Sequence, residues 1–166
     1  MSRDNIIFDL HYSFYLENMF STLMGRVDKT LSLLLIVLGG ITLITSINEF
    51  VFGISVAILS AAQLIFHPGK QGGIASAHAK KYLRLISASG RLDNKMLLKQ
   101  FCELQTLDSR PWRVLKHAAQ WRATIVLDFP NTLAELTWWE CTWSWLAGDL
   151  PKKEEYASRE HRGTNG

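Results

Sequence analysis

The chain has 166 residues, a formal net charge of +3 and a sequence pI of about 9.0. This length leaves room for one small domain beside a long apolar stretch, which excludes a large enzyme. The mild basic charge fits contact with an anionic lipid leaflet better than the wrapping of nucleic acid. We therefore expect no direct sequence-specific binding of nucleic acid.

An amphipathic helix is predicted over residues 4–27, within an N-terminal segment 1–29, and Asp4 is suited to cap it. Aromatic and apolar side chains recur in it at helical spacing: Phe8, Tyr12, Tyr15, Met19 and Leu23. Two interpretations fit this stripe. The helix packs against the cytoplasmic helices, which we favour, or it lies in the membrane interface, where aromatic side chains are enriched.

The longest apolar stretch runs from Thr30 to Phe66, and Glu49 near its middle is its only charged residue. At about 1.5 Å per residue, the arms on either side of Glu49 span roughly 25–29 Å, close to the ~30 Å hydrocarbon core of a bilayer. The first arm also lacks the polar face that a soluble core helix keeps. We predict a two-helix transmembrane hairpin over residues 30–66, the second arm being the weaker.

Small residues recur every four positions along the second arm, at Gly53, Ala57 and Ala61. Such a face lets helix backbones approach closely. With the turn near residue 48 or 49, Gly40 of the first arm lies opposite Ala57. These residues therefore predict tight helix packing, either within one hairpin or between subunits of a homo-oligomer.

A weakly polar stripe follows the first arm: Ser32, Gly39, Thr42 and Ser46. It lines a water-filled path in an oligomer, or its hydroxyls bond back to carbonyls of their own helix. Gln63 is the only amide deep in the second arm, and it needs a partner across a helix interface.

The orientation follows from basic residues that flank the outer ends of the hairpin: Arg26, Lys29, Lys70, Lys80, Lys81 and Arg84. Cytoplasmic loops are enriched in Lys and Arg, so both termini should lie in the cytoplasm. A cleaved signal peptide fits poorly, because acidic residues precede the apolar stretch.

Pro68 and three glycines predict a hinge over residues 67–73, because neither residue type favours a helix interior. The cytoplasmic region 74–150 then begins with a helix over residues 74–89, which Gly90 ends. A second helix starts at Asp93 or Asn94 and has this apolar face: Leu97, Leu98, Phe101, Leu104 and Leu107. A third, over residues 111–127, has this inner face: Val114, Leu115, Ala118, Arg122 and Ile125. We expect these three helices to form a small bundle.

A last helix is predicted over residues 132–147, with Asn131 as its cap. It carries four of the six tryptophans: Trp138, Trp139, Trp143 and Trp145. A monomeric soluble helix rarely exposes so much aromatic surface. The cluster contacts either a protein partner, which we favour, or the membrane interface. The charged tail 151–166 is predicted to be disordered.

No motif in the chain indicates an enzyme, a cofactor or a metal site. Arg110 and His117 have an Arg-x6-His spacing that resembles the ribonuclease motif of the HEPN family. That family usually has a polar residue after the arginine, whereas Pro111 follows here. Electrostatics at a helix start, from Asp108 and Arg110, is the better explanation.

The overall layout resembles the SLATT-type two-transmembrane effectors of bacterial antiviral defence systems. The residues that carry this architectural resemblance are Thr30 to Phe66 and Ser76 to Leu85, within residues 10–110. It implies a toxin-like effector of abortive infection, which a cytoplasmic sensor or inhibitor protein keeps silent. Once released, such an effector oligomerises into a pore and permeabilises the bacterial inner membrane. Such effectors occur beside nucleotide-second-messenger sensors and in retron systems, where a ribonucleoprotein is the guard. A non-toxic membrane anchor that recruits a cytoplasmic partner is the alternative.

Overall fold

The structure is a computed structural model that describes residues 2–41, 49–106, 112–127 and 136–149. Six α-helices and one 3-10 turn make up most of these residues, and no strand occurs among them: α1 (Arg3–Ile41), α2 (Glu49–Phe66), α3 (Pro68–Ala88), η1 (Ser89–Arg91), α4 (Asn94–Gln105), α5 (Val114–Leu127) and α6 (Trp138–Leu146). The predicted all-α class is therefore confirmed. The predicted tail 151–166 lies outside the described residues.

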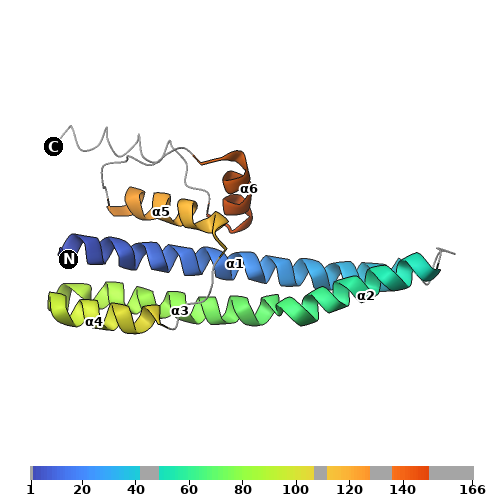
Figure 1. Ribbon diagram of the computed structural model, residues 1–166, viewed down its shortest axis with the longest axis horizontal. Coiled ribbons are helices and arrows are strands. Elements are labelled where there is room, and N and C mark those ends of the chain that lie inside the picture. The colour runs from blue at the N-terminus through green and yellow to red at the C-terminus, as the bar shows by residue number, and fades with distance from the viewer. Residues whose placement is uncertain (1, 42–48, 107–111, 128–135, 150–166) are drawn as a thin grey trace.

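One continuous helix of 39 residues, α1, replaces the two helices predicted on either side of residue 29. The polar residues between them change the environment of the helix but do not interrupt its backbone, since they include no proline. The first part of α1 lies among the other helices, and its last part projects beyond them beside α2 (Figure 1). A single element thus connects the packed body of the protein with its apolar end.

The first part of α1 is the centre of the hydrophobic core. Buried side chains along it are Ile6, Leu10, Leu16, Met19, Phe20, Leu23 and Met24. One cluster joins this helix to α3 and α4 through Tyr82, Leu97 and Phe101, and another joins it to α5 through Leu115 and Ala118. The predicted packing of the N-terminal helix on the helices that follow the apolar stretch is therefore confirmed.

The body has three layers, because α3 and α4 cover one side of α1 while α5 and α6 cover the other (Figure 1). The separate bundle predicted for the three cytoplasmic helices is therefore wrong, since α1 lies between them. Helix α4 begins where predicted and buries Leu97 and Phe101, whereas Leu107 of its predicted face lies outside the described residues. Helix α5 begins three residues later than predicted and α6 six residues later, and η1 replaces the predicted end at Gly90.

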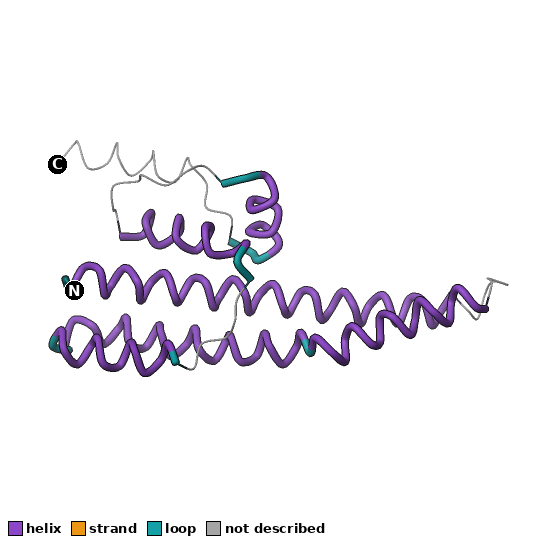
Figure 2. The backbone as a smooth tube through the Cα atoms, in the orientation of Figure 1, coloured by secondary structure: helices purple, strands orange, loops and turns teal. Residues whose placement is uncertain are grey.

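Helix α3 begins at Pro68, so the predicted hinge over residues 67–73 is reduced to one residue. His67 has left-handed backbone angles, φ 43° and ψ 52°, and separates α2 from α3. Pro68 fits there because a proline in the first turn of a helix loses no backbone hydrogen bond. The tube in Figure 2 shows α2 and α3 as two consecutive rods with a short break between them.

Gly72 lies inside α3 because α1 passes very close to it. A Cβ added at Gly72 would lie 3.2 Å from both the Met24 Cβ and the Ser21 carbonyl oxygen. The Ser21 hydroxyl also donates a hydrogen bond to the Gly72 carbonyl oxygen, at 2.9 Å. The loss of helix propensity at this glycine is thus offset by a close contact between α1 and α3.

Candidate functional site: an apolar hairpin and its aromatic base

Helix α2 and the last part of α1 form an antiparallel pair that extends away from the body (Figure 1). Large apolar side chains are exposed along both helices: Leu33, Leu34, Ile36, Val37, Phe50, Val51, Ile54, Ile58, Leu64, Ile65 and Phe66. Soluble monomers rarely expose an apolar surface of this extent.

One helical segment, Phe50–Arg91, contains an 18-residue stretch long and apolar enough to cross a membrane, and none of that stretch is buried. This stretch belongs to the arm that the sequence indicated as the weaker one. The first arm is described only as far as Ile41, because residues 42–48 lie outside the described part.

A hydrogen bond joins the two helices of this pair near their base. The Gln63 Nε2 group donates to the Ser32 hydroxyl oxygen at 3.1 Å, which confirms that Gln63 has a partner across a helix interface. Of the other predicted pore-lining residues, Gly39 is exposed, whereas Thr42 and Ser46 lie outside the described residues. Ser32 is therefore engaged within the pair, where an amide–hydroxyl bond holds the two arms together in an apolar surrounding.

The small-residue face does not mediate packing between α1 and α2. No atom lies within 4 Å of a Cβ added at Gly40 or Gly53, and Ala57 and Ala61 are exposed. The predicted tight contact within one hairpin is therefore wrong, because α1 and α2 meet along other residues. Packing of this face between subunits stays a prediction.

Asp28 lies at the base of the hairpin, against the start of α3. A Cβ added at Gly69 would lie 3.1 Å from an Asp28 carboxylate oxygen, so the carboxylate approaches the first turn of α3 closely. Negative charge is favourable at a helix N-terminus. A cavity of about 390 Å³ opens beside this contact, and its lining includes Gln63, His67 and Lys70.

A second, apolar cavity of about 240 Å³ lies at the same level, between Met24, Leu31, Phe66 and Trp112. The Trp112 ring stands edge-on to the Trp143 ring, with 5.7 Å between their centroids. Trp143 is partly buried and packs against the body, and its predicted place in a partner contact stays a prediction. The other three tryptophans of the cluster remain on the surface, with exposed fractions of 62% (Trp138), 56% (Trp139) and 66% (Trp145).

Helix α6 is attached to α1 directly before the apolar part of α1. Arg26 donates through Nη1 to the carbonyl oxygens of Trp145, at 3.2 Å, and of Leu146, at 2.8 Å. A guanidinium group satisfies carbonyls that have no partner at a helix C-terminus. The sequence indicated for Arg26 only a role in setting the membrane orientation; in the structure Arg26 also positions α6.

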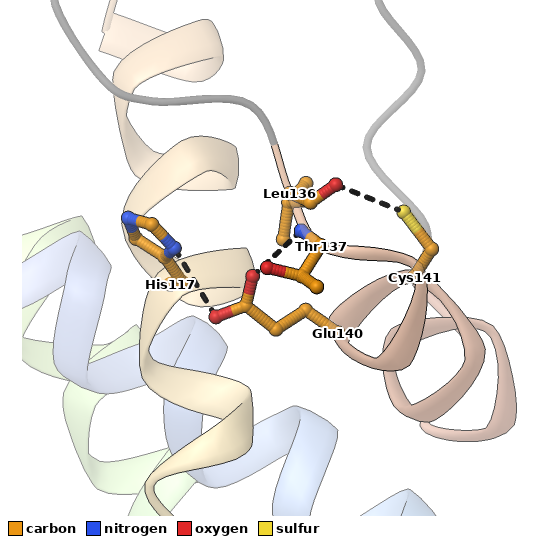
Figure 3. A network of polar contacts seen from close by, with 5 residues as sticks. All are labelled: His117, Leu136, Thr137, Glu140 and Cys141. Carbon is orange, nitrogen blue, oxygen red and sulfur yellow. Dashed lines mark hydrogen bonds and ion pairs between the residues drawn. The ribbon is translucent and has the colours of Figure 1, made fainter.

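The other end of α6 is fixed by Glu140 (Figure 3). Its carboxylate accepts a hydrogen bond from the Thr137 backbone N–H at 2.8 Å and lies 3.2 Å from His117 Nδ1 on α5. The Thr137 side chain in turn accepts a hydrogen bond from the backbone N–H of Glu140, the third residue of the helix. The two reciprocal bonds form a capping box. His117 therefore holds α6 on α5, while Arg110 of the predicted Arg-x6-His pattern lies outside the described residues.

The capping box also sets the charge of Glu140. Burial alone would raise the pKa of this carboxyl group, but the hydrogen bonds from Thr137 and the neighbouring His117 lower it below its ordinary value of 4.5. The stabilisation of α6 by the carboxylate is therefore complete above that ordinary value, and it is lost as the pH falls through the lower folded pKa.

Glu140→Gln is expected to loosen α6, because the amide cannot replace both charge-assisted contacts. Loss of a cap costs about 1 kcal/mol, so backbone amides of α6 should exchange with deuterium roughly fivefold faster. Hydrogen exchange followed by mass spectrometry measures this. Glu103→Gln, on the exposed face of α4, is the matched control; equal exchange in the two variants would contradict a role for the capping box.

Elsewhere in the body, a groove of about 480 Å³ between α3 and α4 is lined by Lys81, Arg84, Gln100 and Glu103. Among the described residues, no group of three or more His, Cys, Asp or Glu side chains is placed to hold a metal ion.

No family model, no curated protein and no solved structure matches this chain. Fold and surface alone therefore define the class of protein: an all-helical chain whose packed body continues into a helical segment that is long and apolar enough to cross a membrane.

Proposed function

We propose that this chain is a two-span protein of the bacterial inner membrane, an effector that oligomerises and permeabilises the bilayer when a cytoplasmic partner releases it. The observation that carries the proposal is the apolar surface of α2 and the last part of α1, which no other described element covers. Burial of apolar surface contributes roughly 25 cal/mol per Å², so an uncovered hairpin strongly favours a bilayer over water.

Oligomerisation is supported by the open face of Gly53, Ala57 and Ala61, which the single hairpin leaves unused. Lipid is as apolar as the hairpin itself, so helices associate in a membrane through close packing and hydrogen bonds rather than through hydrophobicity. Small side chains on an exposed helix face allow that close packing between subunits.

The test is expression of the chain alone in a bacterium, with the membrane potential followed by a voltage-sensitive dye. The effector function predicts rapid loss of the potential, and Ala57→Leu should abolish this loss while the protein stays in the membrane fraction. Ile58→Leu, a change of similar surface on the neighbouring exposed residue, is the control. Normal growth with an intact potential would overturn the effector function.

A non-toxic membrane anchor is the second candidate, and one observation favours it. Within the described part of the hairpin, Ser32 and Gln63 bond to each other and Ser55 bonds back to the Val51 carbonyl oxygen. These polar groups are satisfied without lining a water path. In the anchor, the body would recruit a cytoplasmic partner, and expression of the chain alone would leave the potential unchanged.

A further inference from the structure

Helix α6 has two unlike faces. Residues at helical spacing, Glu140, Trp143, Ser144 and Ala147, are turned toward α5 and α1, and Ser144 and Ala147 are buried there. Trp138 and Trp145 lie on the opposite face with Trp139 beside them, and all three are more than half exposed. The exposed aromatic surface is therefore confined to the side of α6 that faces away from α5.

The level of α6 along α1 is fixed by Arg26, whose guanidinium group binds the last carbonyls of α6. Arg26 precedes Leu31, the first large apolar residue of the hairpin, by roughly 7.5 Å along the helix. The headgroup layer on each side of a bilayer is roughly 5–8 Å deep. When the hairpin is inserted, the C-terminal end of α6 thus lies at headgroup level.

The direction of α6 places its aromatic face toward the bilayer. Figure 1 shows α6 standing upright beside α1 rather than running along it, with α5 on one side of α6 and the hairpin extending on the other. Since α6 packs on α5 through one face, the opposite face is turned toward the hairpin end. A helix that stands upright to the long axis of an inserted hairpin runs parallel to the membrane plane.

We propose that α6 is an interfacial helix, which holds the body against the bilayer by placing Trp138, Trp139 and Trp145 at the boundary between headgroups and acyl chains. This inference rests on the proposed insertion of the hairpin. Tryptophan suits that boundary, because its ring is apolar and its indole N–H finds polar partners there. Trp112, which is 43% exposed beside Leu31 and Phe66, adds a fourth ring at the same level.

The lipid surface is favoured over the protein partner that the sequence suggested. The aromatic face is turned away from α5, and α6 stands between α5 and the hairpin end of the molecule, so bilayer occupies that space as soon as the hairpin is inserted. A soluble partner could reach the face only by entering between body and membrane. Trp143, the one tryptophan of the cluster that packs inward, joins α6 to this body rather than to another molecule.

The experiment uses the full chain in phosphatidylcholine–phosphatidylglycerol vesicles, with tryptophan fluorescence quenched by lipids brominated either near the headgroup end of the acyl chain or near its terminal methyl. We expect strong quenching by the shallow bromines. A variant with Trp138→Phe, Trp139→Phe and Trp145→Phe should lose about half of this quenching or more, since it lacks three of the six tryptophans. Trp121→Phe, at a buried position in the body, should keep it.

A reporter in the hairpin separates this inference from the proposed function. Ile58→Trp, at an exposed position near the middle of α2, added to the triple variant, should be quenched by the deep bromines. Absence of that deep quenching would overturn membrane insertion and with it both proposals. Deep quenching of this reporter, combined with equal shallow quenching in the wild type and the triple variant, would overturn only the interfacial role of α6 and leave a protein contact for its tryptophans.

Discussion

Ile58→Asp is expected to remove most of the protein from the membrane fraction. Ile58 lies near the middle of α2 and is 63% exposed, so in an inserted hairpin it contacts lipid. An aspartate at the centre of a transmembrane helix costs about 2.5–3.5 kcal/mol on insertion scales. Each 1.4 kcal/mol is a factor of ten, so the insertion equilibrium should shift by about a hundredfold or more.

Leu83→Asp is the matched control for this change, because Leu83 is an exposed leucine on α3 within the body. It should leave the protein in the membrane. Extraction of membranes with alkaline carbonate, followed by quantitative blotting, measures both variants. If the hairpin instead lay in water, Ile58→Asp would improve solubility and leave the fold unchanged, and the two variants would behave alike.

Gly72→Leu should separate α1 from α3 and destabilise the whole body. The added side chain meets the Met24 side chain and the Ser21 backbone at 3.2 Å, and backbone atoms cannot move aside cheaply. Overpacking of this kind costs about 1–3 kcal/mol. Thermal unfolding in detergent should therefore show a midpoint lower by roughly 2–4 °C for each kcal/mol.

Gly73→Leu is the control for this second change. Gly73 is exposed, and no atom lies within 4 Å of a Cβ added to it. Leucine also favours a helix interior over glycine by nearly 1 kcal/mol, so this variant should be unchanged or slightly more stable. A midpoint that falls equally in both variants would show that the α1–α3 contact at Gly72 does not limit stability.

The apolar stretch and the helices that follow it were predictable from the sequence because local pattern decides them. The continuity of α1 was not predictable from the sequence. The charged residues near position 28 mark the point where the helix leaves the packed body for the apolar end, and in the sequence this change of environment looks like the end of a helix. Gly72 was interpreted as part of a hinge because glycine disfavours a helix interior. Its actual role is a close contact with α1, and residues distant in sequence determine that contact.

The aromatic helix shows the same division. Its capping box, Thr137 followed three residues later by Glu140, was readable in the sequence and would have placed the helix start correctly. The partial burial of Trp143 and the exposure of Trp145 were not readable, because α5, α1 and Trp112 together decide which face of α6 is covered. Local signals thus located the elements, while the long helix α1 decided how they combine.

The central claim, that the hairpin crosses the membrane twice, is tested most directly by thiol labelling in intact spheroplasts. Cys102 and Cys141, both free, are first replaced by serine. A cysteine is then introduced at Asn48, the residue before α2, or at Lys95, an exposed residue of α4. A two-span protein with a cytoplasmic body predicts that an impermeant maleimide labels Asn48→Cys at once and Lys95→Cys only after lysis. Labelling of Lys95→Cys in intact spheroplasts, or protection of Asn48→Cys until lysis, would contradict it.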